Sequence, residues 1–341
     1  MILPLKRLPL VGRWWRSSAP QRGFKMIARR GLSFLLQAGF VMLLCCWLVG
    51  QITRDRNLLT GLLFYIPAPC VLGAGLAAGL HALYRRKGRP AVFFLLGCLL
   101  PLYVVADVDN QWAPPAIAAP SEGLSLRLIH WNIAWGWKGW EVVSQQLEDY
   151  NADIQILSEV PQRITEGFVA ARTDSERDVE VFAPMIAVSR GQLGEFRWLL
   201  RARDLHIGLF PWTIEGQTVH IMAVDLPSDP LAVREESLGK LLALMEEHAP
   251  DLVVGDFNAP RRSRAISPLP AGYVHAYEAA GSGWSYTWPS PVPVLAIDQC
   301  IVSDRLEPQQ YRLISSLHSD HCMQVFDFRV PYKGTDTALK R

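Results

Sequence analysis

Asp-Leu-Val-Val-Gly-Asp-Phe-Asn, residues 251–258, is a short apolar run that ends in polar side chains. The run Leu252–Val254 has the length and β-branched composition of a buried strand. Asp256 and Asn258 follow where that strand ends. An aspartate before a turn more often caps a helix than catalyses a reaction. The stretch therefore indicates a catalytic site only if other strands also end in polar residues.

The same pattern of an apolar strand followed by polar residues recurs through the last two thirds of the chain. Strands are predicted at 126–133, 154–157, 219–224, 252–254, 296–302 and 323–330, and helices at 140–147 and 234–248. Strands mixed with helices indicate a layered α/β domain. The polar residues at the strand ends are Asn132, Glu159, Asp256, Asn258, Asp298, Asp320 and His321.

These polar residues lie in five short segments whose order is more specific than any one of them. The segments are Trp131-Asn132, Leu157-Ser158-Glu159-Val160, Gly255-Asp256-Phe257-Asn258, Ile297-Asp298 and Ser319-Asp320-His321. In order and spacing they resemble the endonuclease/exonuclease/phosphatase family, which includes deoxyribonuclease I. The resemblance implies a four-layered α/β sandwich of two mixed sheets. It also implies hydrolysis of a phosphodiester or phosphomonoester by metal-activated water.

The resemblance assigns a metal to one group of these residues. Glu159 would be the principal ligand of a divalent cation, Mg²⁺ or Mn²⁺. Asn132 would help to hold the metal or the phosphate, and Asp320 would sit near the metal. A hard cation held by carboxylate and amide oxygens neutralises an anionic ester and lowers the pKa of bound water.

The other matching residues would carry the proton transfers. Asp256 would position or deprotonate the attacking water, and Asn258 would hydrogen-bond the phosphate. His321 would stabilise the transition state or protonate an oxygen, and Asp298 would orient the His321 ring. A histidine whose tautomer is fixed by a carboxylate is a suitable proton donor near neutral pH.

One segment departs from the family pattern. In 221–227, Asp225 stands where many members carry a second histidine, and Ala223 stands where asparagine is common. Asp225 is a candidate for binding metal, water or substrate, and a structural role is equally open. The alternative reading is a membrane-tethered binding protein that keeps the fold but is catalytically impaired. The retained polar set argues against that alternative, because a binding module does not need all of it.

Two further residues are candidates for substrate contact. Arg261 lies in a basic run after Asn258, where it would meet a substrate phosphate or simply be part of a solvated loop. Trp288 belongs to an aromatic cluster before Asp298. Such a cluster is typical of a stacking platform or a wall for a lipid, and still more often of ordinary packing.

The first 120 residues differ from the rest in charge and hydropathy. They carry 14 Lys and Arg against 3 Asp and Glu, a net charge of +11, whereas residues 121–341 carry 20 against 29, a net of −9. Long apolar runs lie at 32–52, 58–83 and 91–106, and Pro67 and Pro69 are expected to kink the second. The three runs predict three transmembrane helices.

Positive charge orients the predicted helices. Residues 1–30 carry eight Lys and Arg and no acid, and the loop at 85–89 carries four more, so both belong on the cytoplasmic side. The chain after residue 107 then lies outside. This predicts a multi-pass protein of the bacterial inner membrane with a periplasmic or extracellular catalytic domain. If the short third run is re-entrant, the domain stays cytoplasmic.

The predicted organisation has five parts: a basic tail 1–30, a transmembrane region 31–106, a Pro/Ala-rich linker 107–123, a catalytic domain 124–332 and a tail 333–341.

The substrate classes left open are a nucleic acid, a phospholipid headgroup and a soluble phosphate ester. The acidic domain counts against processive nuclease action. No obligate protein partner is indicated. Cys300 and Cys322 fit neither a disulfide framework nor a zinc spacing, and we expect both to stay reduced.

Overall fold

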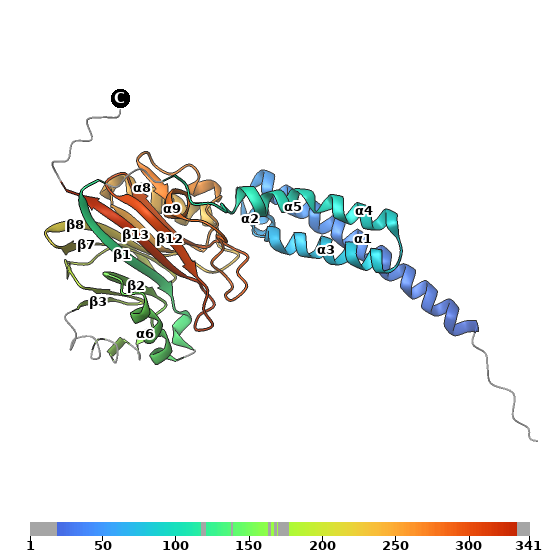
Figure 1. The fold of residues 1–341 in the computed structure, drawn as a ribbon, viewed down its shortest axis with the longest axis horizontal. Coiled ribbons are helices and arrows are strands. Elements are labelled where there is room, and N and C mark those ends of the chain that lie inside the picture. Colours follow the sequence, from blue (N-terminus) through green and yellow to red (C-terminus); the bar gives the residue numbers. More distant parts are fainter. Residues whose placement is uncertain are drawn as a thin grey trace, which may run out of the picture.

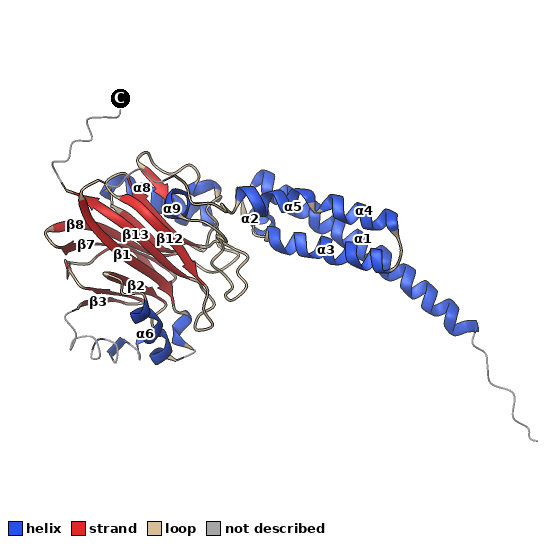
Figure 2. Ribbon diagram, viewed as in Figure 1, coloured by secondary structure: helices blue, strands red, loops and turns tan. Residues whose placement is uncertain are grey.

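The computed structural model describes residues 19–116, 121–137, 139–162, 165–166, 169 and 177–332. An elongated bundle of N-terminal helices projects from one side of an α/β domain (Figures 1 and 2). The predicted tail 333–341 and the first part of the basic tail lie outside the described residues.

The N-terminal bundle contains the three predicted apolar runs. Its elements are α1 (Ala19–Thr53), α2 (Leu58–Phe64), α3 (Ala68–Tyr84), α4 (Gly88–Gly97), α5 (Leu99–Tyr103) and the π-helical turn η1 (Val104–Val108). Ser33–Thr53 and Gly88–Val108 are each 21 residues long and apolar enough to cross a membrane. α2 and α3, with 7 and 17 residues, meet the combined requirement of length and hydropathy only when they are taken together. The described residues therefore hold two candidate spans, or three if this pair is one broken span.

Proline causes the break between α2 and α3. The two helices meet at a bend of 57°. Pro67 precedes the first residue of α3 and Pro69 lies in its first turn, where a missing N–H costs no helical hydrogen bond. The predicted kink in the second run is confirmed.

The α/β domain is built on two mixed sheets. The six-stranded sheet has the order β12-β13-β1-β2-β4-β3, and the seven-stranded sheet has the order β10-β11-β9-β8-β7-β5 with β6 beside β7. The first comprises β1 (Gly123–Asn132), β2 (Ile154–Ser158), β3 (Asp178–Phe182), β4 (Met185–Ser189), β12 (Glu307–Ile314) and β13 (Met323–Pro331). The second comprises β5 (Gln192–Leu193), β6 (Arg197–Ala202), β7 (Leu205–Ile214), β8 (Gln217–Asp225), β9 (Leu252–Asp256), β10 (Tyr273–His275) and β11 (Asp298–Ser303).

Successive side chains along each strand point to opposite faces of the sheet, and this alternation produces the four layers of the fold. In β1, Leu128 faces the other sheet and joins the core between the sheets, whereas Ile129 faces outward. The outward face packs on α6 (Trp140–Asp149). The outer face of the second sheet packs in the same way on α8 (Arg234–His248). The predicted four-layered α/β sandwich is confirmed.

Strand pairing brings the polar ends together at one edge. In the parallel pair β1 and β2, Asn132 lies opposite Ser158, the residue before Glu159. In the parallel pair β8 and β9, Asp225 lies opposite Asp256. Asp298 at the start of the antiparallel β11 also lies opposite Asp256. The carboxyl ends of β1, β2, β8 and β9 and the start of β11 therefore form a single polar rim.

The predicted linker 107–123 differs in the structure from an extended chain. Asp107 and Val108 continue the helical bundle through η1. Asn110 is buried and accepts a hydrogen bond from the backbone of Ser285, and the Gln111 backbone pairs with Gly283. The first part of this segment is thus fixed to the α/β domain.

Candidate active site

Asn132 holds two carboxylates at the centre of the rim. Its side-chain Nδ2 donates to Glu159 Oε1 at 3.0 Å and to Asp256 Oδ2 at 3.1 Å. Its Oδ1 accepts from the backbone N–H of Ala134 at 2.9 Å. In this arrangement Asn132 presents N–H groups to the carboxylates, so it orients Glu159 and Asp256.

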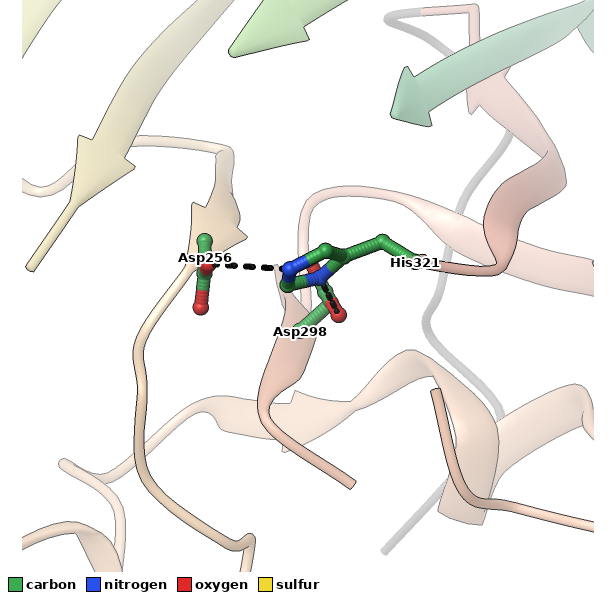
Figure 3. A group of neighbouring side chains, drawn as sticks. All are labelled: Asp256, Asp298 and His321. Carbon is green, nitrogen blue, oxygen red and sulfur yellow. Dashed lines mark hydrogen bonds and ion pairs between the residues drawn. The ribbon is translucent and has the colours of Figure 1, made fainter. Parts of the chain in front are cut away.

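His321 lies between two aspartates (Figure 3). Its Nδ1 is 2.9 Å from Asp298 Oδ2, and its Nε2 is 3.9 Å from Asp256 Oδ2. All three side chains are buried. The Trp131 indole N–H donates to the His321 carbonyl at 3.0 Å, and the Asp298 backbone N–H donates to Thr287 Oγ1 at 3.1 Å. The ring is thus fixed from both sides, as a proton relay requires.

Burial and charge set the protonation of this relay. Burial opposes the charged form of His321, but the Asp298 carboxylate outweighs burial and raises the His321 pKa to about 10. Burial also favours neutral Asp298, yet the His321 ring lowers the Asp298 pKa overall. Burial, followed by repulsion from Asp298, raises the Asp256 pKa well above its ordinary value. The relay therefore places a histidine that is protonated at neutral pH beside a carboxyl group that is more basic than an ordinary aspartate.

The acidic residues around Glu159 are chemically suited to a divalent cation. Burial, reinforced by the Asp225 and Asp320 carboxylates, raises the Glu159 pKa. Among the described residues, the buried Oδ1 atom of Asp320 has no hydrogen-bond partner. Crowded carboxylates with an unsatisfied oxygen match the hard oxygen ligands of Mg²⁺ or Mn²⁺. A cation would relieve the repulsion and give that oxygen a partner.

A second group of possible ligands is less suitable for a metal. Ligand atoms of Asp256, Asp298 and His321 all lie within 4.8 Å of one another. However, Nδ1 of His321 already pairs with Asp298, and its Nε2 faces Asp256. The cluster is better occupied by a shared proton, and a cation fits better beside Glu159.

Three residues of the same rim have strained backbone conformations. Glu159, Trp135 and Asn258 have φ values of 54°, 58° and 47°. Such left-handed conformations are unfavourable for residues other than glycine, and they persist mainly where function selects them. Asn258 is held by its backbone N–H donating to Asp256 Oδ1 at 2.8 Å and its Nδ2 donating to the Leu226 carbonyl at 2.9 Å.

Asp225, which stands at the usual histidine position, faces a histidine from the neighbouring strand. Its Oδ2 lies 3.6 Å from His206 Nδ1, and its side chain is mostly buried. His220, in contrast, is exposed and lies beside Asp251. His220 is therefore a strand-face residue, as its position in the strand predicts, and it does not replace the histidine.

The two remaining candidates for substrate contact have different positions. Trp288 lines the cavity at the rim, and its indole N–H donates to Asp320 Oδ2 at 3.1 Å. Arg261 points elsewhere. It donates to the Asp109 carbonyl at 2.7 Å, and its guanidinium lies 4.2 Å from the centre of the Tyr277 ring. Arg261 joins the helical bundle to the domain and does not line the cavity.

The rim opens into a cavity of about 570 Å³. Its polar wall contains Glu159, Asp256, Asn258, Trp288, Asp320 and His321. Its other wall contains residues that the sequence analysis did not single out: Asp55, Leu58, Leu62 and Tyr65 from the bundle, and Arg234 from α8. The sequence contains a signal that could have identified Arg234 as a functional residue. It is the first residue of its helix, where the helix dipole disfavours a cation, so a buried arginine there needs another reason.

The two domain cysteines are buried free thiols. Burial raises the pKa of Cys322 to about 12 and raises that of Cys300 further. A thiol that resists ionisation is a poor nucleophile and a poor partner for disulfide exchange. The expectation that both stay reduced remains a prediction.

Fold and rim together define a deoxyribonuclease I-like α/β sandwich. The sequence model of the Endonuclease/Exonuclease/phosphatase family matches residues 129–321, more than half of the chain, and the chain belongs to this family.

Solved structures share this fold. One is an endonuclease/exonuclease/phosphatase family protein from Bacteroides thetaiotaomicron, with a TM-score of 0.51, 15% identity, and coverage of 62% of this chain and 100% of that chain. Another is a mannosyl-6-phosphatase from the same organism, with a TM-score of 0.50, 14% identity, and coverage of 60% and 99%. A truncated TDP2 from Caenorhabditis elegans has a TM-score of 0.50, 19% identity, and coverage of 60% and 98%. A comparison with curated protein sequences gives no match.

Proposed function

We propose that this chain is a membrane-anchored, divalent-metal-dependent phosphohydrolase. The observation that carries the proposal is the double hydrogen bond from Asn132 to Glu159 and Asp256, with the His321–Asp298 pair beside it. These five side chains come from five separate regions of the sequence. A fold that needed them only for stability would not place several buried carboxylates against one another.

The chain's own groups account for the proton transfers of hydrolysis. Asp256 accepts a proton from the attacking water when it is in the carboxylate form, and its raised pKa makes that carboxylate a stronger base than an ordinary aspartate. The water oxygen forms a new bond to phosphorus, and the ester P–O bond breaks. His321, protonated at neutral pH, donates a proton to the departing oxygen through Nε2. Glu159 and Asp320 would hold the metal ion, which, when bound, neutralises the phosphate charge and activates water.

A catalytically impaired binding protein is the alternative, and Asp225 is the observation that favours it. A carboxylate there adds negative charge where an anionic substrate must bind. Arg234 offsets this charge, because its buried guanidinium lines the same cavity. We therefore favour the enzyme.

The test uses the full chain purified in neutral detergent. Bis(p-nitrophenyl) phosphate and p-nitrophenyl phosphate serve as soluble diester and monoester. We expect turnover of at least one ester that requires Mg²⁺ or Mn²⁺ and is abolished by a chelator. His321→Ala should remove most of it, whereas the matched variant His220→Ala, at an exposed position, should retain it. Absence of turnover of both esters in the wild type would favour the binding protein.

A further inference from the structure

The cavity at the catalytic rim is closed on one side by the membrane bundle. Glu159 and His321 lie on one wall, and Leu58, Leu62 and Tyr65 of the α2 region lie on another. Most of the catalytic cavity belongs to the α/β domain, yet α2 belongs to the candidate broken span. The groups proposed for catalysis therefore share one space with a helix that is suited to contact lipid.

Polar contacts hold the bundle against the rim. The Tyr65 hydroxyl donates to the Asn258 carbonyl at 3.0 Å. Asp55, only 6% exposed, accepts from the backbone N–H of Arg264 at 2.7 Å and from the hydroxyl of Ser263. Buried charged contacts of this kind fix geometry, because separating them would leave an unpaired carboxylate. The position of α2 over the cavity is thus part of the folded structure.

Leucine side chains lead from the cavity to the outside of the bundle. Leu58 and Leu62 line the cavity and are also 39% and 40% exposed. Val233, on the loop before α8, lines the cavity from the domain side and is 51% exposed. Exposed apolar residues that border a candidate span are expected to face hydrocarbon. A hydrocarbon chain could lie along this path without leaving an apolar environment.

A buried cation lines the same cavity as the apolar path and the catalytic groups. Arg234 is 8% exposed, lines the cavity and lies beside the Tyr65 hydroxyl. One of its Nη atoms donates to the Pro227 carbonyl, which leaves other guanidinium N–H groups for an anion. Arginine matches phosphate oxygens better than lysine because its donors form a planar fork. The cavity thus offers an anion site next to an apolar wall.

We propose that the substrate is a lipid phosphate ester that enters from the bilayer. Its phosphate lies between Glu159, His321 and Arg234, and its hydrocarbon lies along Leu58 and Leu62. This inference rests on the phosphohydrolase activity proposed above. Water adds to phosphorus, the ester P–O bond breaks, and the departing oxygen takes a proton from His321. A lipid phosphomonoester yields a lipid alcohol and inorganic phosphate, and a lipid phosphodiester yields a phosphomonoester and an alcohol.

Nucleic acid fits this cavity less well. A polynucleotide carries a phosphate at every nucleotide and needs a basic surface beside the reacting phosphate. Here that neighbouring surface is the apolar wall of α2, and residues 121–341 carry a net charge of −9. A ligand with one phosphate end and one apolar end matches both walls.

The test compares esters that share a headgroup and differ only in the acyl chains. Dioleoyl phosphatidic acid and dioleoyl phosphatidylglycerol, in mixed micelles of neutral detergent, are compared with glycerol phosphate and glycerophosphoglycerol. The measured quantity is the ratio of kcat/KM for the lipid to kcat/KM for its acyl-free counterpart. We expect the wild type to prefer one lipid at least tenfold. Leu62→Gln and Val233→Gln should each lower that ratio by about tenfold, since each disturbs an apolar contact.

Leu59→Gln is the matched control. Leu59 is on the same helix and 68% exposed but does not line the cavity, so its variant should keep the wild-type ratio. If Leu62→Gln loses its folding transition, Val233→Gln decides the outcome alone. A wild type that hydrolyses the acyl-free esters as well as the lipids, or an unchanged ratio in the variants, would overturn the inference. The p-nitrophenyl esters separate the two proposals: if they are hydrolysed while neither lipid is, only the lipid inference fails.

Discussion

The hydroxyl of Tyr65 donates a hydrogen bond of 3.0 Å to the backbone carbonyl of Asn258. Tyr65 lies at the bend between α2 and α3, and Asn258 lies two residues after β9 with a left-handed backbone. A helical element of the candidate membrane region thus directly supports the strained loop that carries Asp256 and Asn258. The geometry of the rim depends on both parts of the chain.

Tyr65→Phe should therefore weaken the attachment of the bundle to the domain. The substitution keeps the ring and removes the donor, which leaves the Asn258 carbonyl without this partner. The expected loss is about 1 kcal/mol of the free energy of unfolding. Thermal unfolding in detergent measures the loss. Tyr84→Phe, at the strongly exposed end of α3, is the control and should match the wild type. Equal melting temperatures for all three proteins would contradict the role assigned to Tyr65.

His321 and Asp298 should act as one catalytic unit. His321→Ala is expected to lower turnover by roughly a hundred- to ten-thousand-fold, the usual contribution of acid–base assistance. Asp298→Asn should act in the same direction, because it removes the carboxylate 2.9 Å from Nδ1. The double variant should cost little more than His321→Ala alone. Steady-state kinetics on an accepted ester at saturating Mg²⁺ gives all three values, and effects that simply multiply would show that the residues act separately.

Glu159 should govern the affinity for the metal. Glu159→Gln preserves the shape of the side chain but replaces a carboxylate oxygen with a neutral amide, which binds Mg²⁺ poorly. The Mg²⁺ concentration for half-maximal activity should rise roughly tenfold or more. Isothermal titration with Mg²⁺ or Mn²⁺ gives a second readout that does not depend on turnover. Glu247→Gln, at an exposed position on α8, should leave the metal affinity unchanged. An unaltered titration in Glu159→Gln would place the metal elsewhere.

His275 should make the domain less stable in acid. Burial, with a smaller contribution from Arg261, lowers the His275 pKa from 6.5 to about 3. Below pH 6.5 the unfolded chain therefore binds a proton that the folded chain does not, so stability falls as the pH falls from 6.5 towards 3. The expected loss at pH 5 is about 2 kcal/mol.

His275→Gln tests this expectation because glutamine does not titrate. The difference in thermal unfolding between pH 7.5 and pH 5.0 should be smaller in the variant than in the wild type. The comparison uses the change with pH within each protein, so a constant loss of stability from the substitution does not affect it. An identical loss in both proteins would show that other groups dominate the acid sensitivity.

The orientation of the bundle can be tested with reporter fusions. Positive charge in the tail and in the loop at 85–89 predicts that both are cytoplasmic and that the α/β domain is outside. Alkaline phosphatase fused after residue 120 should be active, and a green fluorescent protein fused there should stay dark. Fusions after Lys87 should give the opposite pair of results. A fluorescent fusion after residue 120 would put the domain in the cytoplasm.

Much of the fold could be predicted because strand and helix patterns are local. The strand predicted at 252–254 forms the first three residues of β9, and the helix predicted at 234–248 coincides with α8. The region 178–214 was not predicted. Its strands include β6, which is partly exposed along its length and so lacks the regular alternation of a half-buried strand. β6 and β3 are held by the hydrogen-bonding edges of β7 and β4, which is a non-local property.

The sequence by itself determined which side chains stand at the strand ends, among them Asn132 and Asp256. That information is local, since an apolar run of strand length fixes where its polar successor emerges. Only the tertiary structure decided what those side chains meet. It turned the Asn132 amide towards two carboxylates and directed Arg261 to the Asp109 carbonyl.

The cavity is the clearest case of this division. Leu62 is read from the sequence as one more apolar residue of a membrane helix, and Arg234 as the start of an amphipathic one. Packing places both beside His321 in one space. Contacts between segments so far apart in the chain depend on how whole layers pack, and no local periodicity encodes them. The chemistry of the rim is thus legible in the sequence, whereas the apolar wall that faces it exists only in the folded chain.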